Sequence, residues 1–421
     1  MRLTHLTPGF SLLPSLASAL HLLSPQTCSI PALIPRAFQS TSDPSDGFFT
    51  SSPISTTAGE AVSFTPPPPF VAAVFYTSSP PSWTHEPFCL ESIEAENGFC
   101  VYTNARFASG RGISLIGVPG QVGDALLAGG WRRGGEEGAQ PGEEMSAWRD
   151  MEGPKGRGVV ATASIPGATL LQRLGPVVGV QDPILQAVAR DDRQTLLNVA
   201  VSRLPAKSQE VFWSQVGDGV EGRVETNSFL ARLGRSVYWW QVVVPESARF
   251  NHDCRPNAAF AFSPDELMLE VSTLVPVKPG EEITVSYLAP YLNSTARRAQ
   301  LAEQWSFACT CAACTSSARD TLNSDLRLAQ IEKMIAELTA PAEGRPPDPM
   351  KAQKLVKLHE RERLWGAAGL ARLLVAIEYE RLGDMEKARL WAGKAEVGLG
   401  VWVGREHEFM VKIREVLGKK E

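Results

Sequence analysis

Three cysteines are crowded into one short segment of the chain, Cys309-Thr310-Cys311-Ala312-Ala313-Cys314. Thiolates at this spacing can bind one metal ion, but a structural zinc site takes four tetrahedral ligands. Cys254 is the best fourth ligand, because it lies in an unusually polar segment and no other cysteine has comparable neighbours. A loop of free cysteines or a local disulfide is the alternative. The sequence therefore predicts a zinc site made of Cys254, Cys309, Cys311 and Cys314.

The segment around the fourth cysteine is Arg249-Phe250-Asn251-His252-Asp253-Cys254-Arg255-Pro256-Asn257, which we call the polar loop. It brings two amides, an imidazole and a thiol together around a proline, which favours a turn. Such a loop can bind a ligand through its amide groups and ring nitrogens. Taken alone, it is equally well explained as a loop whose side chains satisfy the ends of the backbone.

Two other segments are candidates for the same site. Pro279-Gly280-Glu281-Glu282-Ile283-Thr284-Val285-Ser286-Tyr287 is typical of a turn that leads into a strand ending on a tyrosine. Lys155-Gly156-Arg157-Gly158 places two glycines around an arginine before a strand, and Gly110-Arg111-Gly112 repeats that pattern elsewhere. Neither glycine segment has the spacing of a dinucleotide-binding fingerprint or of a Walker loop. Each of these patterns is weak by itself.

Together and in this order, the four segments resemble the SET-domain family, in particular fungal-type proteins related to the SET and MYND group. That family has an early Gly-x-Gly turn, an Asn-His-x-Cys-x-Pro-Asn loop, a Gly-Glu-Glu-x-x-x-x-Tyr strand and a Cys-x-Cys-x-x-Cys tail. All four are present, over about residues 153–314. The resemblance implies methyl transfer from S-adenosylmethionine to a lysine of a histone or another protein. Residues 174–249 contain no cysteine, so the MYND zinc module of that group is expected to be missing.

The resemblance also implies which residues bind the cofactor. Glycine suits the early turn because the backbone can approach a ligand where a side chain would block it. The polar loop is expected to contact the cofactor through backbone and side-chain polar groups. Phe307 is expected to lie against adenine, with Trp305 as its rival and a plain core aromatic as the alternative. The cofactor-binding residues implied in this way are Gly156, Arg157, Gly158, Asn227, Asn251, His252, Tyr287 and Phe307.

Tyr287 matches the catalytic tyrosine of the family, and Tyr291 is the alternative hydroxyl. In the implied reaction a lysine amine displaces a neutral thioether at the methyl carbon. Free lysine has a pKa of about 10.4, so the amine must first lose its proton, which a dry channel favours. The implied role of Tyr287 is to orient the amine and shape the pore, rather than to act as the general base. The zinc is structural, because four cysteines leave no open coordination position.

The elements that must position these residues are predicted to form an α+β protein. Short runs rich in β-branched and aromatic residues predict several small sheets, with helical spacing in the middle of the chain and long amphipathic runs after residue 316. These later runs cover residues 322–338, 350–364 and 370–399, and the turn at 379–384 is repeat-like. We expect a disordered Ser/Thr/Pro-rich segment at 1–84, an N-terminal extension at 85–150, a SET domain at 151–290 with a helical insert at about 183–233, a zinc-binding tail at 291–316 and a helical domain at 317–421.

The composition limits the classes of partner. Hydrophobic residues make up 43% and charged residues 21%, an ordinary globular balance. The net charge of -5 provides no overall basic field, so direct nucleic-acid binding is not expected. No segment approaches the ~20 apolar residues of a membrane span. We expect a monomer that does not associate with membranes and that acts on a protein substrate presenting lysine.

The compartment and the activity each have an alternative. An odd set of seven cysteines with a metal-like cluster favours the nucleus, the cytoplasm or both. Export is the alternative, because residues 10–23 resemble a weak signal peptide and Asn293-Ser294-Thr295 is a glycosylation acceptor sequence. Cys89 and Cys100 would then pair, whereas otherwise they are expected to pack as small apolar residues. A catalytically silent SET scaffold that binds partners through its helical tail is the alternative to an enzyme.

Overall fold

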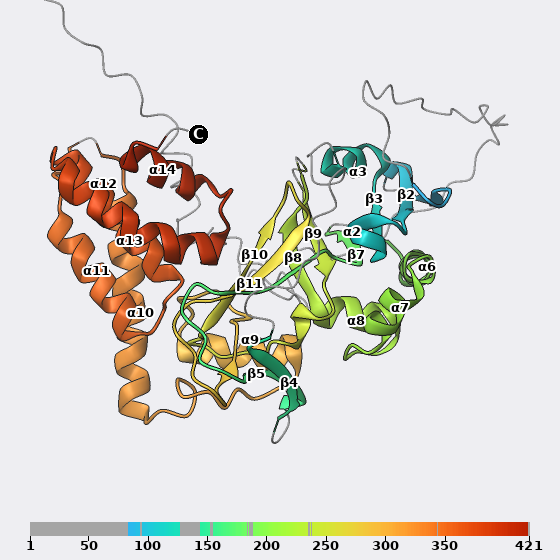
Figure 1. Ribbon diagram of the computed structural model, residues 1–421, viewed down its shortest axis with the longest axis horizontal. Helices are drawn as coiled ribbons and strands as arrows, with labels where there is room; N and C mark the ends of the chain where they lie inside the picture. The colour runs from blue at the N-terminus through green and yellow to red at the C-terminus, as the bar shows by residue number, and fades with distance from the viewer. Residues whose placement is uncertain are drawn as a thin grey trace, which may run out of the picture.

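The computed structural model describes residues 83–92, 95–126, 144–151, 155–182, 184, 188–234, 236, 238–342 and 344–419. Within them the chain forms a β-rich unit with three sheets and a unit of helices toward the C-terminus (Figure 1). The predicted α+β class is confirmed. The predicted disordered segment 1–84 lies almost wholly outside the described residues.

The largest sheet has six strands in the order β1-β2-β3-β7-β9-β8. Neighbouring strands run antiparallel except β3 and β7, which run parallel. Their β-branched and aromatic residues suit a pleated, buried surface. The strands are β1 (Phe88–Ser92), β2 (Ala95–Asn104), β3 (Ile113–Gly117), β7 (Val178–Gln181), β8 (Ser228–Arg232) and β9 (Trp239–Val243).

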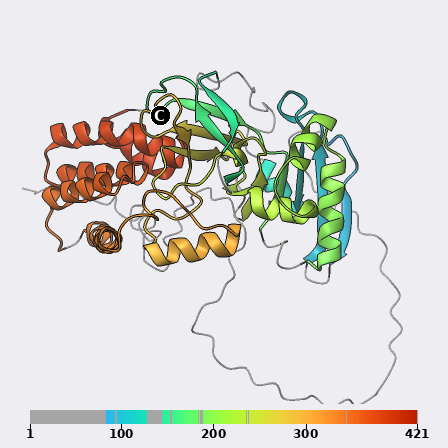
Figure 2. The same ribbon diagram turned by 90° about the horizontal axis from the view of Figure 1, so that it is seen from below.

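This sheet separates two apolar cores, because successive residues of a strand face opposite sides. Leu115 and Trp240 belong to the core that also includes the smaller sheets. Ile116 and Val243 belong to the second core, to which the predicted helical insert contributes. Figure 2 shows these insert helices beside the sheet. They are α6 (Arg190–Ser202), α7 (Ala206–Trp213) and α8 (Gly219–Asn227), and the shorter α2 (Phe107–Gly110) and α3 (Pro119–Leu126) flank β3 in the sequence.

Two three-stranded sheets bring the candidate segments together. One has the order β10-β11-β6 and the other β12-β5-β4. The polar loop leads into β10, the glycine segment enters β5, and Tyr287 follows β12. The strands are β4 (Ser146–Asp150), β5 (Arg157–Ala161), β6 (Leu170–Leu174), β10 (Ala258–Ser263), β11 (Met268–Thr273) and β12 (Glu282–Ile283), and the 3-10 helix η3 (Ser247–Arg249) precedes the loop.

The helical unit follows the predicted amphipathic runs. The run at 370–399 is two helices that separate within the predicted turn at 379–384, where Gly383 adopts a φ of 80° and Asp384 accepts a hydrogen bond from the Lys387 backbone at the start of the next helix. A final helix, α14, was not predicted. The helices are α10 (Ala318–Thr339), α11 (Pro349–Arg361), α12 (Ala367–Arg381), α13 (Met385–Val403) and α14 (Glu408–Leu417).

The expected zinc-binding tail begins with a helix, α9 (Ser294–Trp305), that was not predicted either. Asn293 caps it by accepting a hydrogen bond from the Ala296 backbone, so the side chain of the glycosylation acceptor sequence is engaged as a cap. The helix ends at Ser306, which is left-handed with a φ of 55°. This reversal turns the chain toward Phe307 and the cysteines. In Figure 2 α9 lies between the helical unit and the large sheet.

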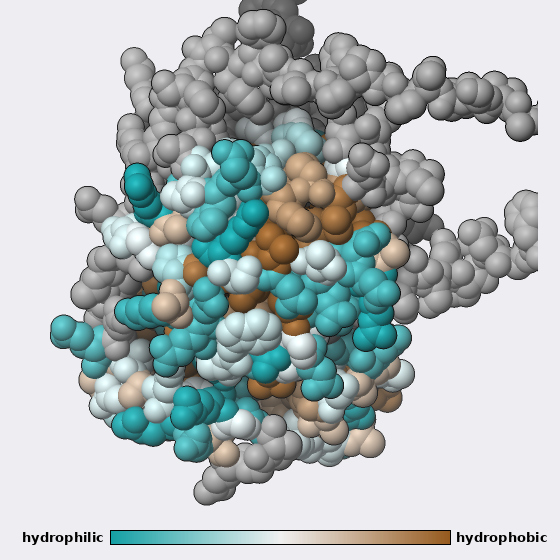
Figure 3. Space-filling view, turned by 90° about the vertical axis from the view of Figure 1, so that its right-hand side faces the viewer, coloured by the Kyte–Doolittle hydropathy of each residue, from teal (hydrophilic) through white to brown (hydrophobic). Residues whose placement is uncertain are grey.

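The opposite end of the molecule contains a disulfide between Cys89 and Cys100, which face each other across β1 and β2. The expectation that these cysteines pack as separate apolar residues is therefore wrong, because the antiparallel register places them directly opposite. Figure 3 shows the right-hand side of Figure 1, where hydrophilic residues predominate beside a smaller apolar area. Across the described ranges, no helix combines the length and apolar composition that crossing a bilayer requires.

Candidate active site

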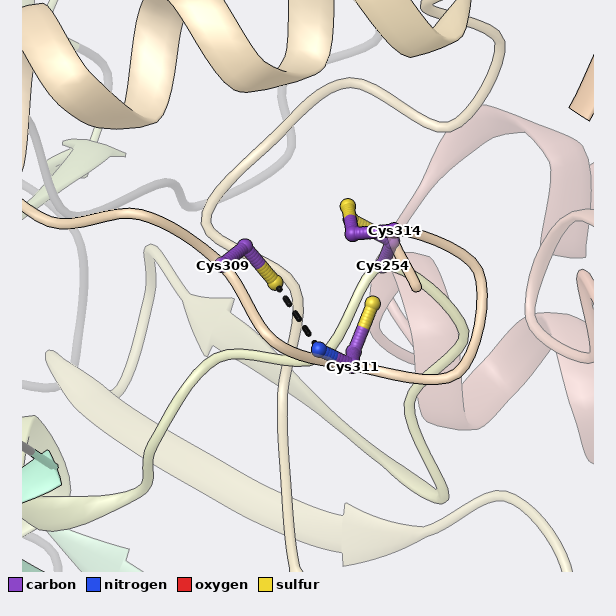
Figure 4. A group of neighbouring side chains, drawn as sticks. All are labelled: Cys254, Cys309, Cys311 and Cys314. Atoms are coloured by element: carbon purple, nitrogen blue, oxygen red, sulfur yellow. Dashed lines mark hydrogen bonds between the residues drawn. The ribbon is translucent and has the colours of Figure 1, made fainter. Parts of the chain in front are cut away.

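The four predicted zinc ligands meet at one point. Cys309, Cys311 and Cys314 follow α9, while Cys254 comes from the polar loop, and their sulfur atoms all lie within 4.8 Å of one another (Figure 4). The Cys254 and Cys314 sulfur atoms are 3.6 Å apart. Tetrahedral zinc with Zn–S bonds of about 2.3 Å requires sulfur atoms about 3.8 Å apart. The cluster, which we call the thiol cluster, fits a four-sulfur structural metal site.

Hydrogen bonding within the thiol cluster divides the pKa values of its members. It lowers the pKa of Cys311 to about 5 and also lowers that of Cys314, whereas it raises the pKa of Cys254 and of Cys309. The thiolate charge of this partly buried cluster therefore lies on Cys311 and Cys314. A divalent cation would neutralise that charge, and thiolates are the form that binds metal.

Backbone hydrogen bonds attach the polar loop to the segment that carries Tyr287. Val285 donates its N–H to the carbonyl of Asn251 at 3.0 Å, and Asp253 donates its N–H to the carbonyl of Val285 at 3.0 Å. His252 lies between them, in a parallel bridge with Val285. These hydrogen bonds hold the main chain of the polar loop beside the main chain that leads to Tyr287, although the two segments are distant in the sequence.

The strand that leads to Tyr287 is shorter than predicted. β12 contains only Glu282 and Ile283, and an isolated bridge at Val285 follows. The amide of Asn257 interrupts the ladder, because it accepts from the Thr284 N–H at 2.9 Å and donates to the Glu282 carbonyl at 2.9 Å. The last residue of the polar loop motif therefore replaces a neighbouring strand at this position.

An aromatic group surrounds His252 beside the thiol cluster. The centroid of its ring is 5.2 Å from that of Tyr287 and 6.2 Å from that of Phe307, and the rings of Tyr287 and Trp305 are 5.3 Å apart. Phe307 and its rival Trp305 are both partly buried in the same cluster. The structure thus brings Phe307 to the polar loop and Trp305 to the tyrosine.

Both ring nitrogens of His252 already have protein partners. Nδ1 accepts the backbone N–H of Tyr287 at 3.0 Å, and Nε2 lies 3.3 Å from the sulfur of Cys254. Burial lowers the pKa of His252 to about 4. His252 therefore has no free ring nitrogen for the side-chain contact with a cofactor that was expected. Only its main chain is left to bind a cofactor by hydrogen bonds.

Tyr287 donates its hydroxyl hydrogen to the carbonyl of Phe250, at 2.9 Å. Burial raises the pKa of Tyr287 well above its ordinary value, and the negative charge of Glu282 adds to this effect. The phenol is therefore neutral at physiological pH. A neutral phenol held by a backbone carbonyl can orient a substrate amine but does not act as a base.

The glycine segment packs directly against the polar loop. A Cβ atom on Gly158 would lie 2.7 Å from Nδ2 of Asn251 and 2.9 Å from Oε1 of Glu282, so a larger residue would displace these side chains. Asn251 donates through that same Nδ2 to the Arg157 carbonyl at 3.2 Å and to Glu282 at 2.9 Å. Gly156 has a φ of 64°, which also favours glycine. The Arg157 side chain points to solvent and pairs with Asp150 at 3.3 Å.

Asn227 lies at the end of α8 and is buried. Its amide donates to the carbonyls of Val216 and Arg223, at 2.7 Å and 2.8 Å, and so holds the connection between α7 and α8. That connection touches the polar loop, because Arg249 donates to the Ser214 carbonyl at 2.6 Å. Asn227 is thus linked to the site through the connection, rather than by a direct bond to the polar loop among the contacts described.

The rival residues lie elsewhere. The hydroxyl of Tyr291 bonds to Nε2 of His359 at 3.0 Å, in the interface with the helical unit. Arg111, of the second glycine pattern, forms a paired contact with Glu246.

Two contributors were missed from the sequence. Glu282 holds both Asn251 and Lys155, the latter at 2.6 Å, and its place in the Gly-Glu-Glu motif was the available signal. Arg255 reaches the helical unit, where Glu362 accepts from it at 2.8 Å. A buried ion pair between distant segments leaves no local pattern, so nothing in the sequence indicated it.

The comparisons with known proteins agree with this geometry. Residues 156–288 match the SET domain family model. This range contains the glycine segment, the polar loop and Tyr287. The chain therefore has a SET domain, and its similarity to SET-domain methyltransferases is shown by the relatives described next.

The chain is 27% identical over 169 residues to histone-lysine N-methyltransferase set5 of Schizosaccharomyces pombe, a match covering 39% of this chain and 53% of that protein. It is 36% identical over 94 residues to histone-lysine N-methyltransferase SMYD3 of Homo sapiens, which covers 22% of this chain and 20% of the relative. It is 38% identical over 71 residues to protein-lysine N-trimethyltransferase SMYD5 of Homo sapiens, covering 16% of this chain and 17% of the relative. The matched regions thus span about half of these relatives or less.

Proposed function

We propose that the protein is an S-adenosylmethionine-dependent protein-lysine N-methyltransferase. The observation that carries this proposal is the convergence of Gly158, Asn251 and Tyr287 beside the thiol cluster, through the contacts among the glycine segment, the polar loop and the strand end. The SET domain and the relatives named as lysine methyltransferases support the same reaction class.

S-adenosylmethionine supplies an electrophilic methyl group. In that reaction the substrate lysine nitrogen, after losing a proton to solvent, would form a bond to the methyl carbon while the carbon–sulfur bond breaks and its electron pair stays on sulfur. Tyr287 positions the amine through its neutral hydroxyl. Gly158 lets the backbone approach the ligand, and the main chain of Asn251 and His252 together with Phe307 binds the nucleoside part.

Zinc is the proposed metal at the thiol cluster. Its role is structural, because four thiolates fill a tetrahedral coordination shell. Zinc bonds would join Cys254 in the polar loop to Cys314 beyond α9. The tail that carries Phe307 would thereby be held against the residues that bind the cofactor.

The proposed substrate is a lysine in a histone or another protein, and the proposed compartment is the nucleus, the cytoplasm or both. The thiol cluster favours a reducing compartment, whereas the disulfide between Cys89 and Cys100 is the observation that favours export. Intact mass measurement of the protein purified from its own cells, with alkylation before and after reduction, separates these compartments. Retention of the bridge together with absence of zinc would contradict the proposal.

Transfer of a labelled methyl group to a protein mixture tests the activity. The full chain should label lysines, and Tyr287→Phe should reduce the rate about 100-fold, because a misplaced reacting group costs that much. Tyr379→Phe is the matched control, since its hydroxyl only accepts from Gln353 in the helical unit. A folded chain that shows no labelling and no cofactor binding would instead support a silent scaffold.

A further inference from the structure

We propose that His252 is a positioning residue that couples the metal-bound sulfur of Cys254 to the backbone of Tyr287 through one fixed ring tautomer. The proposal rests on the proposed metal and methyl-transfer site. It gives a role to the imidazole ring of His252, whose two nitrogens both have protein partners and so are not free to bind a cofactor. His252 is buried, with 6% of its surface exposed. Its ring therefore acts inside the protein.

The tautomer follows from the partner of Nδ1. The backbone N–H of Tyr287 can only donate, and it lies 3.0 Å from Nδ1. Nδ1 must therefore carry the lone pair that accepts this hydrogen bond, and the ring proton must reside on Nε2. The assignment depends on the chemistry of the peptide group, which can only donate to Nδ1 of a neutral ring.

The proton on Nε2 then points to the thiol cluster. Nε2 is 3.3 Å from the sulfur of Cys254, within hydrogen-bond distance for sulfur. A metal thiolate is an acceptor, so the N–H group donates to it and withdraws electron density from the metal–sulfur bond. The same ring thus ties the metal ligand to the peptide that carries the tyrosine.

The tie to Tyr287 occurs where the ladder ends. Val285 makes the last bridge with the polar loop, and Tyr287 lies two residues beyond it. The imidazole acceptor replaces the missing strand partner for the Tyr287 N–H. The imidazole thereby positions the backbone of Tyr287, from which the side chain extends to donate its hydroxyl hydrogen to the Phe250 carbonyl.

His359 provides an internal control with the opposite tautomer. Its Nδ1 lies 2.9 Å from the carbonyl of Leu355, which can only accept, so Nδ1 carries the proton. Its Nε2 then accepts from the hydroxyl of Tyr291 at 3.0 Å. Two buried histidines in one chain are thus expected to give distinct nitrogen spectra.

The first experiment records two-bond nitrogen–proton correlation spectra of the zinc-loaded full chain labelled with ¹⁵N-histidine. His252→Asn and His359→Gln identify the two signals by their loss. The proposal predicts the Nε2–H form for His252 and the Nδ1–H form for His359. An Nδ1–H form at His252 overturns it, and because the native chain is measured, this result does not depend on a variant folding well.

The second experiment separates the two arms of the ring. An Asn side chain places an acceptor near the Nδ1 position, whereas a Gln side chain places a donor near the Nε2 position. His252→Asn in the cobalt-loaded chain should therefore move the thiolate-to-cobalt charge-transfer band to longer wavelength and weaken metal binding about 10–100-fold, as loss of an outer-shell partner does. His252→Gln should leave the band in place.

The backbone arm has the reverse pattern. Hydrogen exchange at the Tyr287 amide, followed by mass spectrometry, should be faster in His252→Gln than in the native chain and unchanged in His252→Asn. Equal effects of both substitutions on both measurements, or no effect of either, would show a merely structural histidine and overturn the proposal. If the native chain transfers no methyl group, the proposed function fails while these spectra still decide the coupling; if cobalt does not bind, the coupling itself fails.

Discussion

The candidate site is assembled from segments that are far apart in the sequence, whereas the helical unit builds its core from neighbours along the chain. Gly158, Asn251 and Tyr287 are joined to the site by close packing and hydrogen bonds, and Cys314 is joined to it through the group of four cysteine sulfur atoms. In contrast, α12 and α13 follow each other directly and pack side by side (Figure 1). Long-range order at the site therefore has to be imposed by a few specific ties, while the helices need only their apolar faces.

Each region also depends differently on buried charge. Glu362 binds Arg255 of the polar loop at 2.8 Å and also Arg327 of α10, so it joins the two units. Glu378 binds Arg345 and Arg381 within the helical unit alone. Burial disfavours ionisation of both carboxylates, but their hydrogen bonds lower the pKa overall. Substituting Glu362 therefore breaks the link between the two units, whereas substituting Glu378 affects only the helical unit.

The largest expected effect is from removing the metal. Structural zinc sites contribute on the order of 10 kcal/mol to folding at neutral pH. A strong chelator, or Cys254→Ser, should therefore disorder the polar loop and the tail, while the helical signal of α10 to α14 persists. Circular dichroism in the far and near ultraviolet measures both. Simultaneous loss of all helical signal would contradict the independence of the two regions.

Breaking the link between units comes next. Glu362→Gln leaves the Arg255 guanidinium buried without a countercharge, and breaking a buried pair costs about 3–5 kcal/mol. Urea unfolding should show this loss, together with weaker binding of S-adenosylmethionine by calorimetry. Glu378→Gln is the matched control and should lower stability without changing that affinity. Equal effects of both variants on affinity would mean that Glu362 has no special connection to the site.

A smaller effect is expected at the glycine segment. Gly158→Ala forces a Cβ against Asn251 and Glu282, and such overpacking costs about 1–3 kcal/mol. Gly156→Ala has open space around its Cβ but an unfavourable φ, so it tests strain without a clash. Only Gly158→Ala should weaken cofactor binding more than tenfold. Calorimetry on both variants gives the comparison, and the reverse order would place the ligand closer to Gly156.

The smallest expected effect is a dependence of stability on pH in the helical unit. Burial lowers the pKa of His359 from 6.5 to about 4, so the unfolded chain binds more protons between these values. The resulting stability is complete above pH 6.5 and is lost as pH falls toward 4, by about 2 kcal/mol between pH 7 and 5. Urea midpoints at both pH values should differ less in His359→Gln. An unchanged difference would exclude this histidine as a source.

The sequence predicted which segments lie together better than it predicted the contacts that support them. Cysteine spacing indicated Cys254, and the resemblance to the SET family indicated His252 and Tyr287; the structure brings the three residues together, while their roles stay predictions. The amphipathic period likewise predicted α10 and α11. Local sequence patterns were enough to predict a feature wherever it depends on the residue types of that segment alone.

Features set by tertiary contacts were not predictable in this way. The end of β12 depends on the side chain of Asn257, and the link between units depends on Glu362. The pairing of Cys89 depends on strand register, which its neighbours in sequence do not reveal. In each case a distant partner outweighed local preference.

The most direct test of the account is calorimetric titration of S-adenosylmethionine into the zinc-loaded full chain and into the same chain after chelation. We expect one molecule bound per loaded chain and affinity at least tenfold weaker after zinc removal, because zinc at the thiol cluster would hold the tail with Phe307 against the polar loop. Equal binding by both forms, or no binding by a folded, loaded chain, would contradict the proposed site.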